Sequence, residues 1–257
     1  MNECSLCGGT GWHPVERNGW RAVEICPCRK QPRDEQWWME RARIPRGFWE
    51  AGPDEPKDFE HFYHLGNPSL QMALVKARGF AENFPMVDKG LLFIGNPGVG
   101  KTHLTVAILR HLMTGKGIDC LFFSFPDLLE QLQESYDPVA LRSKAEILQP
   151  VLETEVVAID DLGARRVSDW VEDTVTYILN YRYNQKKATI LTSNLPDAPP
   201  ETATRGSAGR QRVSDTLLDR IGIRIYSRLF EMCEKVPIHA EDHRQTVHQH
   251  TQPWKHR

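Results

Sequence analysis

Five apolar runs of strand length are spaced along the chain, at residues 91–94, 118–124, 156–160, 189–194 and 236–239. Between them, apolar side chains recur at helical spacing, over residues 67–84, 103–109, 126–136, 139–148 and 170–186. Continuous β-branched runs are typical of strands buried on both faces, which occur in parallel sheets with helical crossovers. The pattern therefore predicts an α/β fold, with a parallel five-stranded sheet and helices on both of its faces.

The first strand leads into a loop that fills every position of the pattern G-x-x-x-x-G-K-[ST]. Its residues are Gly95, Asn96, Pro97, Gly98, Val99, Gly100, Lys101 and Thr102, with His103 opening the next helix. Such loops wrap backbone N–H groups around phosphate oxygens. Lys101 would reach the β- and γ-phosphates, and the Thr102 hydroxyl would bind Mg²⁺. A glycine-rich turn is the alternative, but the strand before the loop and the helix after it favour an ATP site.

Two acidic residues end the third predicted strand. Asp160 is predicted to hold Mg²⁺, and Asp161 to orient or deprotonate an attacking water. Asn194 ends the fourth strand at the same edge of the sheet, where its amide would hydrogen-bond the γ-phosphate or that water. A surface turn after the strand is the alternative for the two acids, and a cap or turn residue the alternative for Asn194.

Six arginines follow between residues 205 and 228: Arg205, Arg210, Arg212, Arg220, Arg224 and Arg228. The Gly/Ser-rich part, 204–211, is predicted to be a mobile loop. The later part is predicted to be helical, with Arg220, Arg224 and Arg228 on one face. Such a row suits the phosphates of nucleic acid, or the γ-phosphate of ATP in a neighbouring subunit. A solvated helix face is the alternative.

Composition adds little to this picture. The chain has 257 residues, 40% hydrophobic and 26% charged, with a net charge of −2. That charge gives no general attraction to nucleic acid, so contact with DNA would need local clusters. No apolar run approaches the roughly 20 residues of a membrane span, and the first residues show no secretory signal. We expect a cytoplasmic protein with no membrane partner.

Four of the six cysteines lie in the first 28 residues: Cys4, Cys7, Cys26 and Cys28. In a reducing compartment such a set favours a tetrahedral zinc site over two disulfides. Alternation over residues 20–25 predicts a strand that delivers the second pair. The spacing C-x₂-C…C-x-C departs from the common double C-x₂-C, so thiols without metal remain the alternative. Bound zinc would account for the folding of so small a module.

These patterns divide the chain into four parts. Residues 1–33 form the predicted zinc-binding module, and 34–60 a helix and linker, because 44–56 is rich in proline and glycine. The ATPase domain is expected over 61–240. Residues 241–257 are expected to be a disordered tail, whose histidines are too loosely spaced to indicate a metal site.

Taken together, these motifs resemble the helicase-loader family of AAA+ ATPases, the DnaC-like proteins and their IstB-like relatives in transposition. The resemblance rests on residues 42–50, 58–62, 95–104, 156–163, 192–196 and 219–232. It implies a P-loop NTPase fold of AAA+ type and ATP hydrolysis with Mg²⁺. Only 18 residues follow the last predicted strand, too few for a C-terminal lid, and we expect this chain to depart from the family pattern there. The resemblance also implies that Asn194 is a sensor and that Arg228 reaches into the adjacent protomer's site. The cysteines resemble the zinc-type modules with which loaders grip a replicative helicase.

Three functions agree with the motifs to different degrees. The favoured hypothesis is an ATP-dependent loader of a replicative DNA helicase, which binds single-stranded DNA and self-assembles into a homo-oligomer through an arginine finger. Residues 1–33 would then dock on the helicase. The alternative is an IstB-like transposition accessory ATPase that assembles on target DNA, although the cysteines speak against it. A small-molecule kinase is the third hypothesis. The Thr-Ser-Asn sequence at the end of the fourth strand and the arginine-rich helix argue against it.

Overall fold

The computed structural model describes residues 4–7, 12–17, 20–27, 34–49, 56–64, 66–135, 143–166, 168–197 and 216–243. The chain divides into two compact units, Met1–Trp38 and Met39–Arg257. The smaller unit contains an antiparallel hairpin of β1 (Trp12–Arg17) and β2 (Trp20–Ile25). The predicted strand over 20–25 is present as β2. Helix α2 (Glu35–Arg41) spans the boundary between the units.

The larger unit is built on a five-stranded sheet in which the paired strands all run parallel, as predicted. Its strands are β3 (Gly90–Gly95), β4 (Cys120–Ser124), β5 (Val156–Asp160), β6 (Ala188–Ser193) and β7 (Cys233–Ile238). Their order is β4-β5-β6-β3-β7. The carboxyl ends of β3, β5 and β6 therefore meet at one edge, which is where ligands bind in sheets of this kind.

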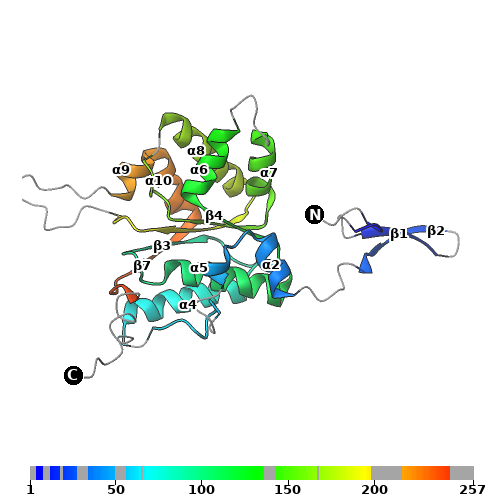
Figure 1. Ribbon diagram of the computed structural model, residues 1–257, viewed down its shortest axis with the longest axis horizontal. Coiled ribbons are helices and arrows are strands. Elements are labelled where there is room, and N and C mark those ends of the chain that lie inside the picture. The colour runs from blue at the N-terminus through cyan, green and yellow to red at the C-terminus, as the bar shows by residue number, and fades with distance from the viewer. Residues whose placement is uncertain are drawn as a thin grey trace, which may run out of the picture. The chain divides into compact units, whose positions relative to one another are not determined.

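Helices cover both faces of this sheet (Figure 1). One face carries α4 (Pro68–Asn83) and α5 (Lys101–Arg110), which continues into the π-helical turn η1 (His111–Gly115). The other face carries α6 (Phe125–Glu134), α7 (Lys144–Glu153), α8 (Asp169–Asn184), α9 (Leu217–Ile221) and α10 (Ile223–Met232). Alternate strand residues fill the two cores, Leu92 and Ile94 on the second face and the buried Leu91 and Phe93 on the first.

Two helical predictions need correction. The helix expected over 139–148 instead begins at Lys144, because Ser143 and Glu146 form a capping box, and it continues past Pro150 to Glu153. Residues 139–142 lie outside the described part. The arginine-rich helix is broken at Gly222, whose φ of 82° only glycine adopts readily. Arg220 therefore belongs to α9 and the other two arginines to α10, so the expected single face of three arginines is wrong.

The stretch predicted to be a linker begins as part of the larger unit. Helix α3 (Arg46–Trp49) buries Trp49, and Ala42 and Ile44 ahead of it are also buried. The Ala42 carbonyl accepts a hydrogen bond of 2.8 Å from the backbone N–H of Phe122 in β4, the edge strand. Residues 39–49 therefore cover the outer edge of the sheet.

None of the described helices is both long and apolar enough to cross a membrane.

Candidate nucleotide site and cysteine cluster

The phosphate-binding loop joins β3 to α5 at the carboxyl edge of the sheet. Gly98 and Gly100 have φ values of 78° and 95°, so the loop uses its glycines for left-handed backbone. Gly100 precedes the first residue of α5, and its carbonyl accepts from the Leu104 N–H at 3.0 Å. The loop thus leads directly into a helix N-terminus, where backbone N–H groups and the helix dipole favour a phosphate.

Lys101 lies buried beneath this loop. Its Nζ donates to the carbonyls of Gly95 and Asn96, both at 2.8 Å. The ammonium is therefore held beside the place that the loop offers to an anion. A bound triphosphate would draw it from these neutral acceptors to charged oxygens, because charge-assisted hydrogen bonds are stronger.

Hydroxyl groups hold Asp160 from two sides. Thr102 Oγ1 donates to the two carboxylate oxygens, at 3.1 and 2.9 Å. Thr192 Oγ1, from the neighbouring strand β6, donates to Oδ1 at 2.6 Å. The structure thus brings Thr102 and Asp160 together, the two residues predicted to bind Mg²⁺. Hard cations such as Mg²⁺ prefer hydroxyl and carboxylate oxygens, so this donor set fits the ion.

Burial raises the pKa of the Asp160 carboxyl, an effect opposed by the hydrogen bonds from Thr192 and Thr102 and increased by the charge of Asp161. The carboxylate is almost fully buried, with 3% of the residue exposed. A buried carboxylate beside a second one favours a cation as its neighbour.

Asp161 and Asn194 contact each other, as expected if both face the reacting phosphate. Asn194 Nδ2 donates to Asp161 Oδ1 at 2.7 Å. Asp161 has a φ of 57°, which is uncommon for a residue other than glycine and is frequent at functional sites. Its N–H donates to Thr192 Oγ1 at 2.9 Å. Asp161, which follows β5, is thus positioned by Thr192 of β6 and by Asn194 just after that strand.

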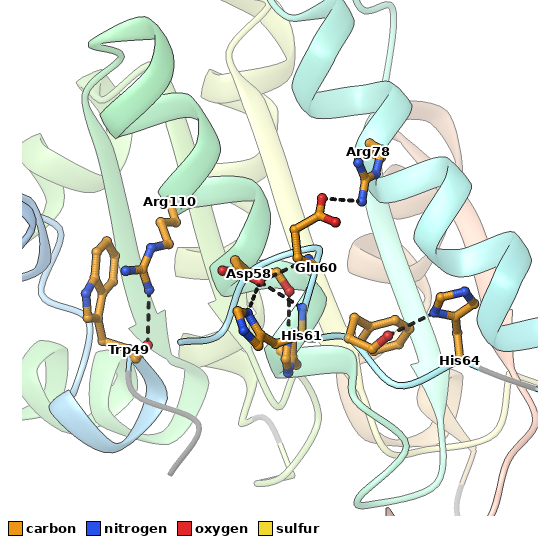
Figure 2. Close-up of polar contacts among 9 residues, drawn as sticks. Trp49, Asp58, Glu60, His61, His64, Arg78 and Arg110 are labelled. Carbon is orange, nitrogen blue, oxygen red and sulfur yellow. Dashed lines mark hydrogen bonds and ion pairs between the residues drawn. The ribbon is translucent and has the colours of Figure 1, made fainter. Parts of the chain in front are cut away.

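The segment 56–64 forms one wall beside the loop (Figure 2). Asp58 Oδ1 accepts from the backbone N–H groups of Glu60 and His61, both at 2.9 Å, and lies 2.7 Å from His61 Nδ1. Glu60 pairs with Arg78 of α4 at 3.0 Å. These contacts shape the segment into a tight turn against α4.

This turn reaches the start of α5 through His103 and Phe62. His103 Nε2 lies 2.7 Å from the Asp58 carbonyl oxygen, and burial lowers the pKa of its imidazole. The Phe62 ring meets His103 edge-on at 5.3 Å and covers Gly100, where a Cβ would come within 2.6 Å of it. His103, expected to bind the nucleotide, therefore faces the protein itself in this structure.

Residues 239–243, here called the C-terminal strap, pack on the phosphate-binding loop and on the segment 56–64. The His243 N–H donates to the Gly98 carbonyl at 3.2 Å, and a Cβ on Gly98 would overlap the Asp242 carboxylate. The His243 ring stacks on Tyr63 with centroids 5.4 Å apart. Residues 241–243 were expected to be part of a disordered tail, and they pack instead on the phosphate-binding loop. Residues 244–257 lie outside the described part.

The predicted arginine finger makes contacts within the chain. Arg228 pairs with Glu231, and its guanidinium lies over the Tyr183 ring, 4.7 Å from the centroid. Arg224 forms a separate ion pair with Asp173, in which the nitrogen and oxygen atoms are 2.7 Å apart. Arg205, Arg210 and Arg212 lie outside the described residues. The structure thus places Arg228 on the outer face of α10, and its role between subunits stays a prediction.

Three of the four predicted zinc ligands lie together in the smaller unit. The Sγ atoms of Cys4, Cys7 and Cys26 are all within 4.8 Å of one another, and those of Cys4 and Cys26 are 3.7 Å apart. Tetrahedral zinc–sulfur bonds of about 2.3 Å place sulfurs about 3.8 Å apart, so the cluster fits zinc. Cys28 lies outside the described residues. Cys120 and Cys233 are buried in β4 and β7.

Comparison with known proteins agrees with this geometry. Residues 54–251 match the family model described as IstB-like ATP binding protein. The chain belongs to this family. The match covers the loop, both acidic residues, Asn194 and the strap. The predicted nucleotide site thus lies within a match to a family of ATP-binding proteins.

Two relatives come from Bacillus subtilis (strain 168). Protein XkdC of phage-like element PBSX is 26% identical over 241 residues, 90% of this chain and 79% of XkdC. The replicative helicase loader DnaI is 28% identical over 203 residues, 73% of this chain and 60% of DnaI. A match to a third protein of the same bacterium, YqaM, spans 34% of that protein. Apart from XkdC, these matches thus cover less than two thirds of the relative.

A crystal structure of the DnaC helicase loader is 36% identical and aligns with a TM-score of 0.59. The alignment covers 76% of this chain and 100% of that chain. The fold of the larger unit is therefore that of the DnaC loader structure, which confirms the predicted fold class.

Some residues of the site are absent from the sequence prediction. Thr192 lies inside an apolar strand, and a threonine there reads as an ordinary β-former. Asp242 and His243 follow the last strand without any motif. Thr192 could have been found by the period of two along β6, which puts it on the same face as Asn194.

Proposed function

We propose that this chain is an ATP-dependent loader of a replicative DNA helicase. The likeness to the DnaC loader structure supports the proposal most strongly, because it combines 36% identity with full coverage of that chain. The relative named replicative helicase loader DnaI, which this chain matches over 73% of its own length, adds to that support.

The nucleotide chemistry of the proposal follows from the loop and the acidic pair. Lys101 and the loop N–H groups would hold the phosphates of ATP, while Thr102 and Asp160 would hold Mg²⁺. Asp161 would orient the attacking water, and Asn194 would keep Asp161 in place through their hydrogen bond. The bound ion would supply charge neutralisation for the leaving phosphate.

Self-assembly enters the proposal through Arg228. Its contacts with Glu231 and Tyr183 are exposed or partly exposed and can be exchanged. A neighbouring subunit's γ-phosphate would offer a stronger partner for a guanidinium. The homo-oligomer formed in this way would carry single-stranded DNA in a basic groove.

The cysteine cluster supplies the proposed helicase contact. The hairpin belongs to a compact unit of its own, which zinc bound by the cysteine cluster would stabilise. Such a module can bind the helicase while the core changes its nucleotide state. Removing residues 1–33 is therefore expected to abolish helicase binding and to leave ATP binding intact.

The test is a loading assay with the replicative helicase of the source organism and circular single-stranded DNA. The full chain with ATP is expected to raise the amount of helicase on the circle, and Lys101→Ala to remove this effect because phosphate binding is lost. Lys76→Met, which removes an exposed ion pair with Glu234, serves as the control outside the site. Helicase that neither binds the chain nor is loaded by it would overturn the proposal.

The family match itself favours a second candidate, an IstB-like transposition accessory ATPase. Such a protein would assemble with ATP on duplex target DNA. Binding measurements with labelled duplex and single-stranded DNA of equal length separate the two candidates. ATP-dependent preference for duplex, without helicase binding, would favour the second.

A further inference from the structure

One buried hydroxyl group joins the two acidic residues of the nucleotide site. Thr192 is fully buried in β6, with an exposed fraction of 0%. Its Oγ1 donates to Asp160 Oδ1 at 2.6 Å and accepts from the Asp161 N–H at 2.9 Å. A hydroxyl has one proton to donate, so these two bonds fix its direction.

The sheet register explains why Thr192 occupies this place. Strands β5 and β6 pair in parallel with Ile159 opposite Leu191, and Asp160 and Thr192 each follow by one residue. Along β6 the next side chain on the same face is Asn194, which donates to Asp161. Thr192 in β6 and Asn194 just after it therefore contact the two acidic residues at the end of β5.

From this geometry we infer that Thr192 is a positioning residue, which holds Asp160 ready for Mg²⁺ and Asp161 in its left-handed backbone conformation. The inference deepens the proposed ATPase function and rests on it. The hydrogen bonds of the Thr192 hydroxyl go to Asp160 and Asp161. Thr192 acts through the two carboxylates.

The Thr102 hydroxyl, which also donates to Asp160, cannot hold this carboxylate in place once Mg²⁺ is bound. Thr102 Oγ1 donates to both Asp160 oxygens, yet it is also an expected ligand of Mg²⁺. A cation that enters between Thr102 and Asp160 breaks these bonds. The bond from Thr192 comes from the adjacent strand and can persist, so it would keep the carboxylate from rotating when the ion binds.

The backbone conformation of Asp161 also depends on a hydrogen bond with Thr192. A φ of 57° costs a residue other than glycine about 1 kcal/mol or more. The hydrogen bond from its N–H to Thr192 offsets part of that cost and selects this conformation. Without it, the Asp161 carboxylate would lose its fixed position beside Asn194.

The test uses Thr192→Val, which keeps the β-branched shape and removes the hydroxyl. ATP binding is measured with a fluorescent analogue, once in EDTA and once with Mg²⁺. In the wild type, Mg²⁺ should strengthen binding. In the variant this gain should fall about tenfold, as expected for one lost hydrogen bond to a charged group, while binding in EDTA stays within about twofold of wild type. Hydrolysis at saturating Mg²⁺ should also slow.

Two further variants separate positioning from stability. Thr192→Ser restores the hydroxyl and should recover most of the Mg²⁺ gain. Thr105→Val is the matched control, since Thr105 is also a fully buried threonine and its Oγ1 has no hydrogen-bond partner among the described residues. It should leave the Mg²⁺ gain unchanged. If Thr192→Val fails to fold, Thr192→Cys, a weak donor of similar size to serine, is compared with Thr192→Ser instead.

The outcomes distinguish this inference from the proposed function. A wild-type chain that does not bind ATP would overturn the proposed function. A wild-type chain that binds ATP with a normal Mg²⁺ gain, together with an equal gain in a folded Thr192→Val or Thr192→Cys, would overturn the role of Thr192 alone.

Discussion

Arg182 shows how much of this fold depends on a single polar side chain. It is fully buried on α8, and its guanidinium donates to backbone carbonyls and a hydroxyl rather than to a carboxylate. Its guanidinium donates to the carbonyls of Val151 and Thr154, which end α7, and to Thr189 Oγ1 at the start of β6. The side chain thus ties a helix end to the strand that carries Thr192 and Asn194.

We therefore expect Arg182→Met to lower the free energy of unfolding by about 2–4 kcal/mol, because several buried acceptors lose their donor at once. Urea unfolding followed by circular dichroism measures this change. Arg78→Met, which removes an exposed ion pair with Glu60, should cost no more than about 1 kcal/mol. Equal costs for the two variants would contradict the structural role of Arg182.

The site residues divide into those that the sequence can reveal and those that it cannot. Lys101, Thr102, Asp160 and Asp161 follow from motifs, because phosphate and Mg²⁺ chemistry requires those residue types at those places. The Thr102–Asp160 and Asp161–Asn194 contacts agree with that expectation. Asp242 carries no such signal, because its position depends on how the chain folds back after β7.

At the scale of elements, the sequence predicted strands better than helix ends. Each strand is a compact apolar run, so its bounds shifted by only a residue or a few. The start of α7 was misplaced because the capping box at Ser143 outweighs the apolar pattern before it. The break at Gly222 was missed because the arginines on either side keep a spacing of four.

That break gives a test of helix geometry. Gly222→Ala should destabilise the protein by about 1–3 kcal/mol, because its φ is 82° and a Cβ would lie 2.8 Å from the Glu172 carboxyl group. Gly79→Ala is the matched control within α4, where a Cβ meets nothing within 4 Å. Gly79→Ala should stabilise the protein by about 0.5–1 kcal/mol. In thermal unfolding, Gly222→Ala should therefore lower the melting temperature and Gly79→Ala should raise it.

The hairpin with its cysteine cluster is expected to depend on zinc. Cys26→Ser should lower the zinc content of the purified protein and change the fluorescence of the tryptophans in β1 and β2, because one tetrahedral ligand is lost. Elemental analysis and emission spectra provide the readouts. Cys120→Ser, a change to a buried thiol outside the cluster, should leave the zinc content as it is. Protein purified without any zinc would refute the metal site.

At the scale of the whole molecule, the nucleotide site is enclosed by segments far apart in the chain. The segment 56–64 and the C-terminal strap both contact the phosphate-binding loop, and they contact each other where His243 stacks on Tyr63. His239 anchors the strap, because its carbonyl accepts from Asn67 Nδ2 at 2.9 Å and from Ser69 Oγ at 3.0 Å. Nucleotide phosphates that enter the loop would therefore meet the Asp242 carboxylate.

Asp242→Asn should consequently strengthen ATP binding by about fivefold, since one negative charge near the phosphates is worth about 1 kcal/mol in water. Titration with a fluorescent ATP analogue measures the affinity, and the gain should shrink as salt is added. Glu241→Gln, a change to the exposed neighbouring carboxylate, should have a smaller effect. Weaker binding by Asp242→Asn would show that the carboxylate assists the nucleotide instead.

Because residues 39–49 cover the edge strand β4, an isolated fragment of the ATPase unit has to include them. A fragment that starts at residue 61, the boundary that the sequence suggested, would expose the N–H groups of an edge strand and the hydrophobic surface beneath Trp49. Open strand edges pair with one another, so such a fragment is prone to aggregate. A fragment that starts at Met39 keeps its own cover, and it is the shorter chain on which the solution behaviour of this ATPase can be studied.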